Sequence, residues 1–172
     1  DKGIDIHFFI GNHDIWTFGY LESECGVKLH TKGEIFKLYN KNVYVGHGNE
    51  LRKCQTRSYR LMNSFFHCKV AQWLFSRLIH PDIAMWLGLK WSRHNRTKRQ
   101  PQLRFKGEQD PIVQSILDIH RTNNLDYCIL GHFHSMITHQ CQSGPKIAIM
   151  GDWIFNPSYC VLNESGLQLL KL

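Results

Sequence analysis

The chain has 172 residues, of which 42% are hydrophobic and 12% aromatic, and this composition excludes a disordered or fibrous protein. We expect one globular domain. The six cysteines are scattered and include no C-x-x-C pair, which argues against a disulfide framework and a zinc ribbon. The sequence has no apolar run of about 18 residues and no leader-like start, so we expect a cytoplasmic protein with reduced thiols that does not cross a membrane.

The net charge of +7 is concentrated in one segment. From Arg52 to Lys106 the sequence carries 13 Lys or Arg and one acidic residue, a net charge of +12. The rest of the chain carries 8 basic and 13 acidic residues, a net charge of −5. This asymmetry predicts an anionic partner for the basic segment.

Apolar periodicity and turn residues predict alternating strands and helices. Gly26 suits the C-terminus of a helix, and Asp110-Pro111 suits a helix start, because Asp caps free N–H groups and Pro fits the first turn. The expected elements are a strand at 4–10, a helix at 15–25, a hairpin of 34–39 and 43–45, helical residues 57–93 broken at His80-Pro81, a mobile loop at 92–106, a helix at 110–123, a strand at 127–130 and three further short strands.

Three of the expected strands end in metal-capable side chains next to glycine. Because the C-terminal ends of strands in an α/β sheet meet at one edge, these side chains can converge. Any one of the motifs alone is equally typical of a turn with surface histidines. Their combination favours a metal site, and imidazole with amide or carboxylate oxygens suits manganese, iron or zinc. The motifs are Gly11-Asn12-His13-Asp14, Gly46-His47-Gly48 and Gly131-His132-Phe133-His134.

In this order the motifs resemble three of the five blocks of the calcineurin-like metallophosphoesterases. The resemblance implies an α/β fold in which helices flank a mixed β-sandwich. It implies two divalent metal ions, with Asn12, His47 and His132 binding one and His134 binding the other. It further implies that residues 1–172 are the C-terminal part of one metallophosphoesterase domain.

By the same resemblance, His13 is the catalytic residue that contacts the phosphate, and Asp14 orients it. An imidazole suits this task because its pKa lies near neutral pH. The family's first two blocks, D-x-H and G-D-x-x-D, are absent, since Asp5-Ile6-His7 lies within a strand. We therefore expect that the N-terminal strands and several metal ligands are missing, that the activity of this chain by itself is doubtful, and that the uncovered sheet can pair with a second copy.

Residues 52–107 are expected to form a helical, basic lid inserted in the domain. A lipid with a phosphate head group requires both apolar surface and basic side chains. The lid, followed by Gly151-Asp152-Trp153, is similar to that of the UDP-2,3-diacylglucosamine pyrophosphatases, many of which have arginine where this chain has His13. The substrate-binding residues expected from the lid are Trp73, Trp86, Arg93, Asn95 and Arg96.

This similarity implies hydrolysis of a lipid-linked nucleotide to UMP and 2,3-diacylglucosamine 1-phosphate in lipid A biosynthesis. It also implies manganese as the usual metal and a peripheral position on the cytoplasmic face of the inner membrane. No nucleic-acid partner is expected.

Three alternatives stay open. The lid helices can simply cover the core, with their charges on a solvated face. The lid can instead contact a nucleotide or nucleic acid, which ranks second because its aromatic residues occur at helical spacing among aliphatic ones. The chain can also be a binding module without catalysis. The remaining histidines are expected to be solvated or hydrogen-bonded, with His94 a weak candidate for function; they are His7, His30, His67, His80, His94, His120 and His139.

Overall fold

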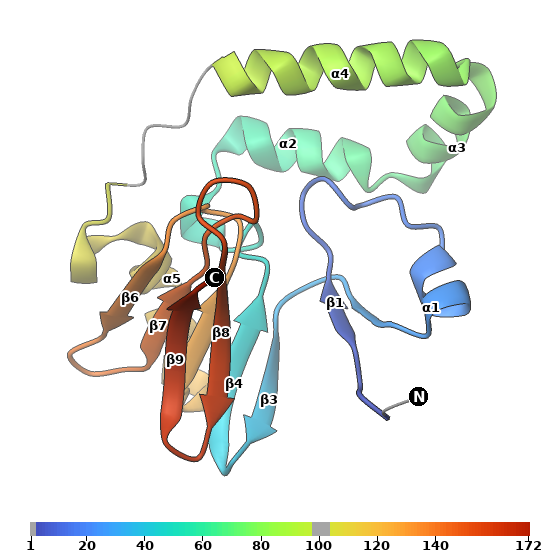
Figure 1. Ribbon diagram of the computed structural model, residues 1–172. Coiled ribbons are helices and arrows are strands. Elements are labelled where there is room, and N and C mark those ends of the chain that lie inside the picture. Colours follow the sequence, from blue (N-terminus) through green and yellow to red (C-terminus); the bar gives the residue numbers. More distant parts are fainter. Residues whose placement is uncertain (1–2, 98–103) are drawn as a thin grey trace. The chain divides into compact units, whose positions relative to one another are not determined.

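The computed structural model describes residues 3–97 and 104–172, with the backbone alone for residues 91–97. The chain divides into two compact units (Figure 1). Residues 1–55 together with 105–172 form the first, which we call the core unit, and residues 56–104 form the second, the helical unit.

The core unit contains all nine of the described strands and, among its described residues, a single long helix. Its elements are β1 (His7–Phe9), α1 (Tyr20–Cys25), β2 (Lys28–His30), β3 (Glu34–Leu38), β4 (Lys41–Gly46), η1 (Arg52–Cys54), η2 (Gly107–Gln109), α5 (Pro111–Asn123), β5 (Tyr127–Leu130), β6 (Ile137–Gln140), β7 (Lys146–Ile149), β8 (Ser158–Asn163) and β9 (Gly166–Lys171). The elements of the helical unit are α2 (Arg57–Phe66), α3 (Lys69–Leu78) and α4 (Pro81–Thr97).

A mixed five-stranded sheet in the order β3-β4-β5-β7-β6 organises the core unit. The central strands β4, β5 and β7 are parallel, and the outer strands β3 and β6 are antiparallel to their neighbours. Gly46 pairs with Leu130, and Leu130 pairs with Ile149, so the three parallel strands end level with one another. The loops that follow these strands therefore leave the sheet at the same edge. Two smaller sheets, the parallel β1-β2 and the antiparallel β8-β9, complete the described strands.

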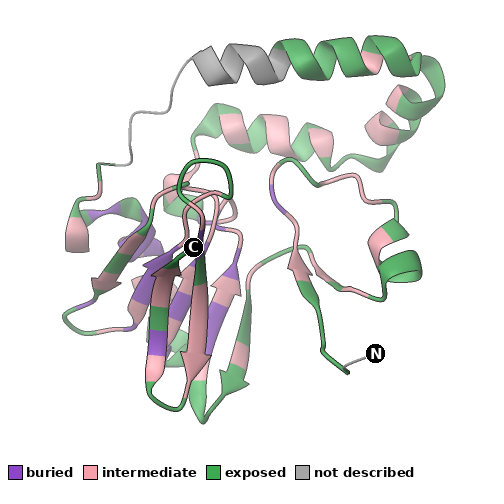
Figure 2. Ribbon diagram, viewed as in Figure 1, coloured by how far each residue is buried: buried purple, intermediate pink, exposed green. Residues whose placement is uncertain are grey.

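The hydrophobic core lies between the five-stranded sheet and α5. In Figure 1, α5 lies behind the sheet and β8-β9 lies in front of it, and the buried residues in Figure 2 gather on the central strands and on α5. Asp110 is only 3% exposed, and its carboxylate accepts a hydrogen bond from Ile112 N at 2.9 Å, which caps the helix as predicted. The fully buried side chains include Val43, Ile112, Val113, Ile116, Cys128, Leu130, Ile147 and Ile149.

Backbone conformations account for two differences from the predicted elements. α1 begins at Tyr20 rather than near residue 15, because Phe18 and Gly19 have φ values of 49° and 80°, which a right-handed helix does not admit. The hairpin turn is centred on Tyr39 and Asn40, with φ values of 50° and 60°, as in a two-residue turn of the type I′ class. β4 consequently starts at Lys41, two residues earlier than predicted.

The helical segment contains more helix and one more break than predicted. The break at His80-Pro81 is confirmed, and a second one at His67-Cys68 separates α2 from α3. The prediction of a loop from residue 92 is wrong up to Thr97, because α4 continues to that residue. Residues 98–103 of the predicted loop lie outside the described residues. The chain ends in four strands after β5, one more than predicted.

The helical unit buries no side chain fully in α2 or α3, every residue of which the structure describes. Leu61, Leu78 and Phe65 are 77%, 74% and 64% exposed. Other exposed apolar residues of this unit are Val70, Trp73, Leu74, Ile83, Met85, Trp86, Leu87 and Leu89. Exposed apolar side chains in this number are typical of a binding surface. Within the described residues, no helix is both long enough and apolar enough to span a bilayer.

Gly46, the last residue of β4, is expected to tolerate no larger side chain. A Cβ atom there would collide with the Glu50 carboxylate and lie 3.0 Å from Gly33 Cα. Gly46→Ala should therefore lower the free energy of unfolding by about 1–3 kcal/mol in chemical denaturation. The control is Gly88→Ala in α4, where a Cβ meets nothing within 4 Å and a helical alanine should instead stabilise by about 0.5–1 kcal/mol. Equal effects of the two changes would contradict this packing.

Candidate functional site

Three loops of the core unit carry the predicted metal ligands, and each follows a strand. Asn12 lies three residues after β1, His47 follows β4, and His132 follows β5 by two residues. Gly131 N donates to His47 O at 3.1 Å, so the loops after the two parallel strands are joined directly. The level ends of β4 and β5 thus place His47 beside the Gly131–His134 turn.

Asn12, His47 and His132 lie together although 120 residues separate the first from the last. Nδ1 of His132 lies 3.2 Å from Oδ1 of Asn12, and the rings of His47 and His132 have their centroids 5.2 Å apart. Gly11 permits the approach, because a Cβ at this position would lie 2.9 Å from Cε1 of His47 and 3.0 Å from Oδ2 of Asp14. Two imidazoles, an amide oxygen and a carboxylate therefore share one small region.

His134 and Asp152 extend this region towards the loop after β7. Nδ1 of His134 lies 3.7 Å from Oδ2 of Asp152, and the His134 side chain is exposed whereas that of Asp152 is 14% exposed. Asp152 Oδ1 accepts hydrogen bonds from Phe155 N at 2.6 Å and Ile154 N at 2.9 Å. The bond from Phe155 N is the largest effect that lowers the pKa of Asp152, so this carboxyl stays ionised beside His134.

The turn that carries His132 and His134 has a strained backbone. Their φ values are 63° and 51°, a left-handed conformation that non-glycine residues rarely adopt. Phe133 N donates a hydrogen bond to Gly131 O at 2.7 Å, which closes a tight turn centred on His132. Strain of this kind costs about 1–3 kcal/mol per residue and is concentrated at functional sites. The strained turn therefore agrees with a site at these two histidines.

Glu50 fixes the loop that carries His47, and sequence reasoning missed it. Its Oε2 accepts a hydrogen bond from Gly48 N at 2.7 Å, and its Oε1 accepts one from the Tyr44 hydroxyl at 3.1 Å. Tyr44 is 5% exposed, and burial followed by the Glu50 charge raises its pKa above the usual range, so the hydroxyl remains a donor. The only signal in the sequence is a carboxylate two residues after Gly48.

The two half-buried histidines are held in the neutral form. Burial, followed by the neighbouring His47, His134 and His13, lowers the pKa of His132 to about 4. Burial also lowers the pKa of His47, against the opposing charges of Glu50 and Asp14. A neutral imidazole has a free nitrogen lone pair, which is the form that binds a metal ion. His13 and Asp14 are exposed at the rim of the same region.

The donor set fits a divalent ion of the manganese, iron or zinc class. The structure brings Asn12, His47 and His132 together, with His134 in the same turn as His132. Amide oxygen and imidazole nitrogen without thiolate match such ions. The neutrality of the imidazoles removes the electrostatic barrier that an imidazolium would present to a cation.

The predicted substrate-binding residues belong to the helical unit, which the structure describes separately from these loops. Trp73 and Trp86 are each 57% exposed, and Lys90 Nζ lies 4.8 Å from the ring centroid of Trp86. Arg93, Asn95 and Arg96 lie on α4, and their side chains are outside the described part of the chain.

Comparison with known proteins finds relatives named UDP-2,3-diacylglucosamine hydrolase. The chain is 29% identical over 182 residues to the UDP-2,3-diacylglucosamine hydrolase of Porphyromonas gingivalis, an alignment that covers 98% of this chain and 69% of the relative. Enzymes of that name from Histophilus somni and Hamiltonella defensa are 26% and 28% identical, over 98% of this chain and 70% and 69% of theirs. No protein-family model matches the chain. The resemblance to these enzymes is thus confirmed, and their name supports the predicted hydrolase class.

The environment of His132 leads to a pH-dependent prediction for the metal-free protein. NMR titration of chelator-treated protein should show His132 protonating near pH 4, with the signal assigned by its loss in His132→Gln. The unfolded chain takes up this proton near about pH 6.5, so the unfolded state binds more protons between these values. The free energy of unfolding should therefore decrease as the pH drops from about 6.5 to about 4. A His132 titration near its ordinary value would contradict the burial described above.

Proposed function

We propose that this chain is the greater part of a metal-dependent hydrolase that cleaves the pyrophosphate bond of UDP-2,3-diacylglucosamine. The products are UMP and 2,3-diacylglucosamine 1-phosphate. The observation that carries the proposal is the meeting of Asn12, His47 and His132 at the level ends of β4 and β5. The names of the aligned relatives support the choice of substrate.

In this proposal Asn12, His47 and His132 hold one divalent ion and His134 contributes to a second. Divalent ions bound there supply Lewis acidity to the phosphate and activate water for attack. Manganese suits the nitrogen and oxygen donors. Glu50 keeps the His47 loop in place through Gly48 N, and the Asp152 carboxylate orients His134 from 3.7 Å.

His13 is the residue proposed to contact the substrate phosphate. It is exposed next to the proposed ligands, so its ring can reach a bound phosphate, whereas the half-buried His132 cannot titrate near neutral pH. An N–H of His13 would donate to a phosphate oxygen and stabilise the charge that collects as the P–O bond to the lipid-linked phosphate breaks. Asp14, at the same rim, would orient the ring.

The helical unit is the proposed lid for the acyl chains. Its exposed apolar residues have no core of their own in α2 and α3, so they need another apolar partner. Each acyl methylene buried against them contributes about 0.8 kcal/mol. The described basic side chains of the unit, including Arg57, Arg60, Lys69, Arg77 and Lys90, far outnumber its acidic residue Asp82 and suit a pyrophosphate or an anionic bilayer surface. These features support a peripheral position at the inner membrane.

The experiment is a UMP-release assay on the protein with all the residues that its gene encodes. UMP release from UDP-2,3-diacylglucosamine should require Mn²⁺ and should greatly exceed release from UDP-N-acetylglucosamine, which has no acyl chains. His132→Gln should lower kcat/KM by more than about 100-fold. Replacing a residue that only bonds to a metal ligand already lowers metal affinity or activity about 10–100-fold, and His132 is a proposed ligand itself.

The matched control is His120→Gln in α5. This histidine bonds to Leu125 O at 3.0 Å and lies outside the proposed site, so its replacement should leave kcat/KM unchanged. UMP release that is independent of Mn²⁺, or equally impaired in both variants, would contradict the proposal. Hydrolysis of nucleic acid or a soluble nucleotide alone would favour the second candidate, a nucleotide or nucleic-acid phosphodiesterase.

A further inference from the structure

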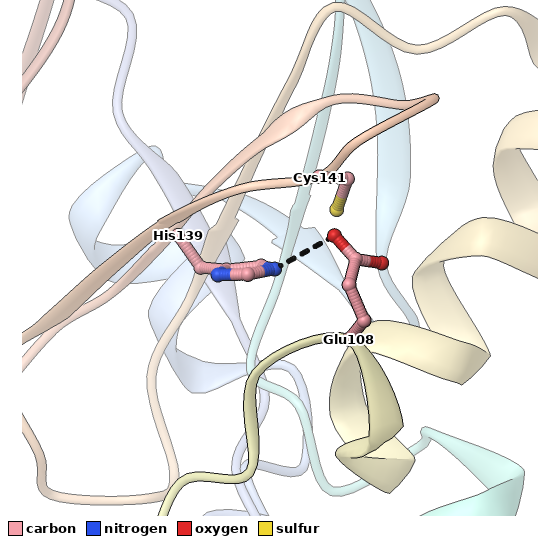
Figure 3. Close-up of side chains that lie close together, drawn as sticks. All are labelled: Glu108, His139 and Cys141. Carbon is pink, nitrogen blue, oxygen red and sulfur yellow. Dashed lines mark hydrogen bonds and ion pairs between the residues drawn. The ribbon is translucent and has the colours of Figure 1, made fainter.

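Three chemically reactive side chains meet in the core unit outside the candidate site: Glu108, His139 and Cys141 (Figure 3). Their ligand atoms all lie within 4.8 Å of one another. Nε2 of His139 lies 3.1 Å from Oε1 of Glu108. In Figure 3 the sulfur of Cys141 and the ring of His139 both point towards this carboxylate.

Rigid elements hold each of the three residues. Glu108 lies in η2, where its carbonyl oxygen accepts from Gln114 Nε2 at 2.7 Å and its carboxylate accepts from Gln142 N at 2.9 Å. His139 lies in β6, which pairs with the buried strand β7. Cys141 directly follows β6, and its N–H donates to Pro145 O at 3.3 Å. The cluster is therefore built on the end of the edge strand β6 and on η2, just before α5.

The three side chains of the cluster differ in their exposure to solvent. Cys141 is 2% exposed, whereas the side chains of His139 and Glu108 are 19% and 32% exposed. The Phe105 ring lies edge-on to His139, with the ring centroids 5.3 Å apart, and covers part of the imidazole. An ion can reach the carboxylate and imidazole from solvent and then contact the buried sulfur.

We propose that Glu108, His139 and Cys141 form a second metal site that binds a zinc-class divalent ion. Carboxylate, imidazole and thiolate are all zinc ligands, and on a tetrahedral zinc ion such atoms lie roughly 3.4–3.6 Å apart. The ligand atoms now lie within 4.8 Å of one another, so small side-chain rotations would bring them to that geometry. Three protein ligands leave the fourth position for water.

The thiolate distinguishes this site from the one at His47 and His132. Soft sulfur ligands favour zinc and cobalt over manganese, whereas the nitrogen and oxygen donors of the candidate active site contain no sulfur. One protein can then hold different metals at the two places. Cysteine spacing gave no hint of the second site, because a single cysteine takes part in it.

Binding must release the proton of the thiol. Burial, followed by the Glu108 charge, raises the pKa of Cys141 to about 11, so the thiol is protonated in the metal-free protein at neutral pH. The metal–sulfur bond forms as this proton passes to solvent, while the ion replaces the contact between His139 and Glu108. Affinity should accordingly rise with pH, since fewer protons compete for the sulfur at higher pH.

The test uses Co²⁺ as a spectroscopic substitute for Zn²⁺ on the complete, reduced protein. A cobalt–thiolate bond gives a near-ultraviolet charge-transfer band that nitrogen and oxygen ligands do not give. We expect this band on addition of Co²⁺, its loss on addition of Zn²⁺, and a stronger band at higher pH. The same band should persist in His132→Gln, because that change affects only the candidate active site.

Matched cysteine variants decide the outcome. Cys141→Ser should abolish the band, and Cys25→Ser, at an exposed and uninvolved thiol, should retain it. Glu108→Gln keeps an acceptor for Gln142 N and so preserves the fold, but it should weaken Co²⁺ binding at least about tenfold. Absence of the band in the unmodified protein, its persistence in Cys141→Ser, or unchanged affinity in Glu108→Gln would overturn the proposal.

Discussion

The candidate site depends on the shared register of the parallel strands β4 and β5. Gly46 pairs with Leu130, so the residues that follow each strand leave the sheet side by side, and Gly131 N bonds to His47 O. A slip of one residue would turn every side chain of a strand to the opposite face of the sheet and separate the two loops. The buried apolar residues of these strands and of α5 oppose such a slip. Core packing and site geometry thus have the same cause.

Glycine residues allow the close approach of side chains at the site, and the half-buried Glu50 carboxylate stabilises it. Gly11 admits the His47 ring, Gly46 leaves room for the Glu50 side chain, and Glu50 binds both Tyr44 and Gly48 N. The low pKa of His132 follows from the same crowding, since burial and three other histidines disfavour its charge. The protein therefore gives up stability at acidic pH to keep a neutral donor at the site.

Sequence patterns predicted the parts of the fold that local chemistry determines. The Asp110 cap, the break at His80-Pro81, β5 and the three glycine-flanked motifs were readable because each depends on residues close in sequence. The cluster at Glu108 depends on contacts between distant segments, which no periodicity reveals. Glu50 bonds to residues only two and six positions away, but no hydrophobic pattern marks the loop geometry that brings its carboxylate to Gly48 N and the Tyr44 hydroxyl. α4 extends past the predicted loop start because the polar residues 92–97 continue a helix begun by apolar ones. The predicted domain boundaries and site roles remain predictions.

The central claim is that Asn12, His47 and His132 together bind a metal ion. Its most direct test is a crystal structure of the Mn²⁺-loaded protein, with data collected at the manganese absorption edge. We expect an anomalous peak within coordination distance of the Asn12 amide oxygen and one imidazole nitrogen each of His47 and His132. Occupied manganese peaks that lie only elsewhere, with Nδ1 of His132 still about 3.2 Å from Oδ1 of Asn12, would contradict it.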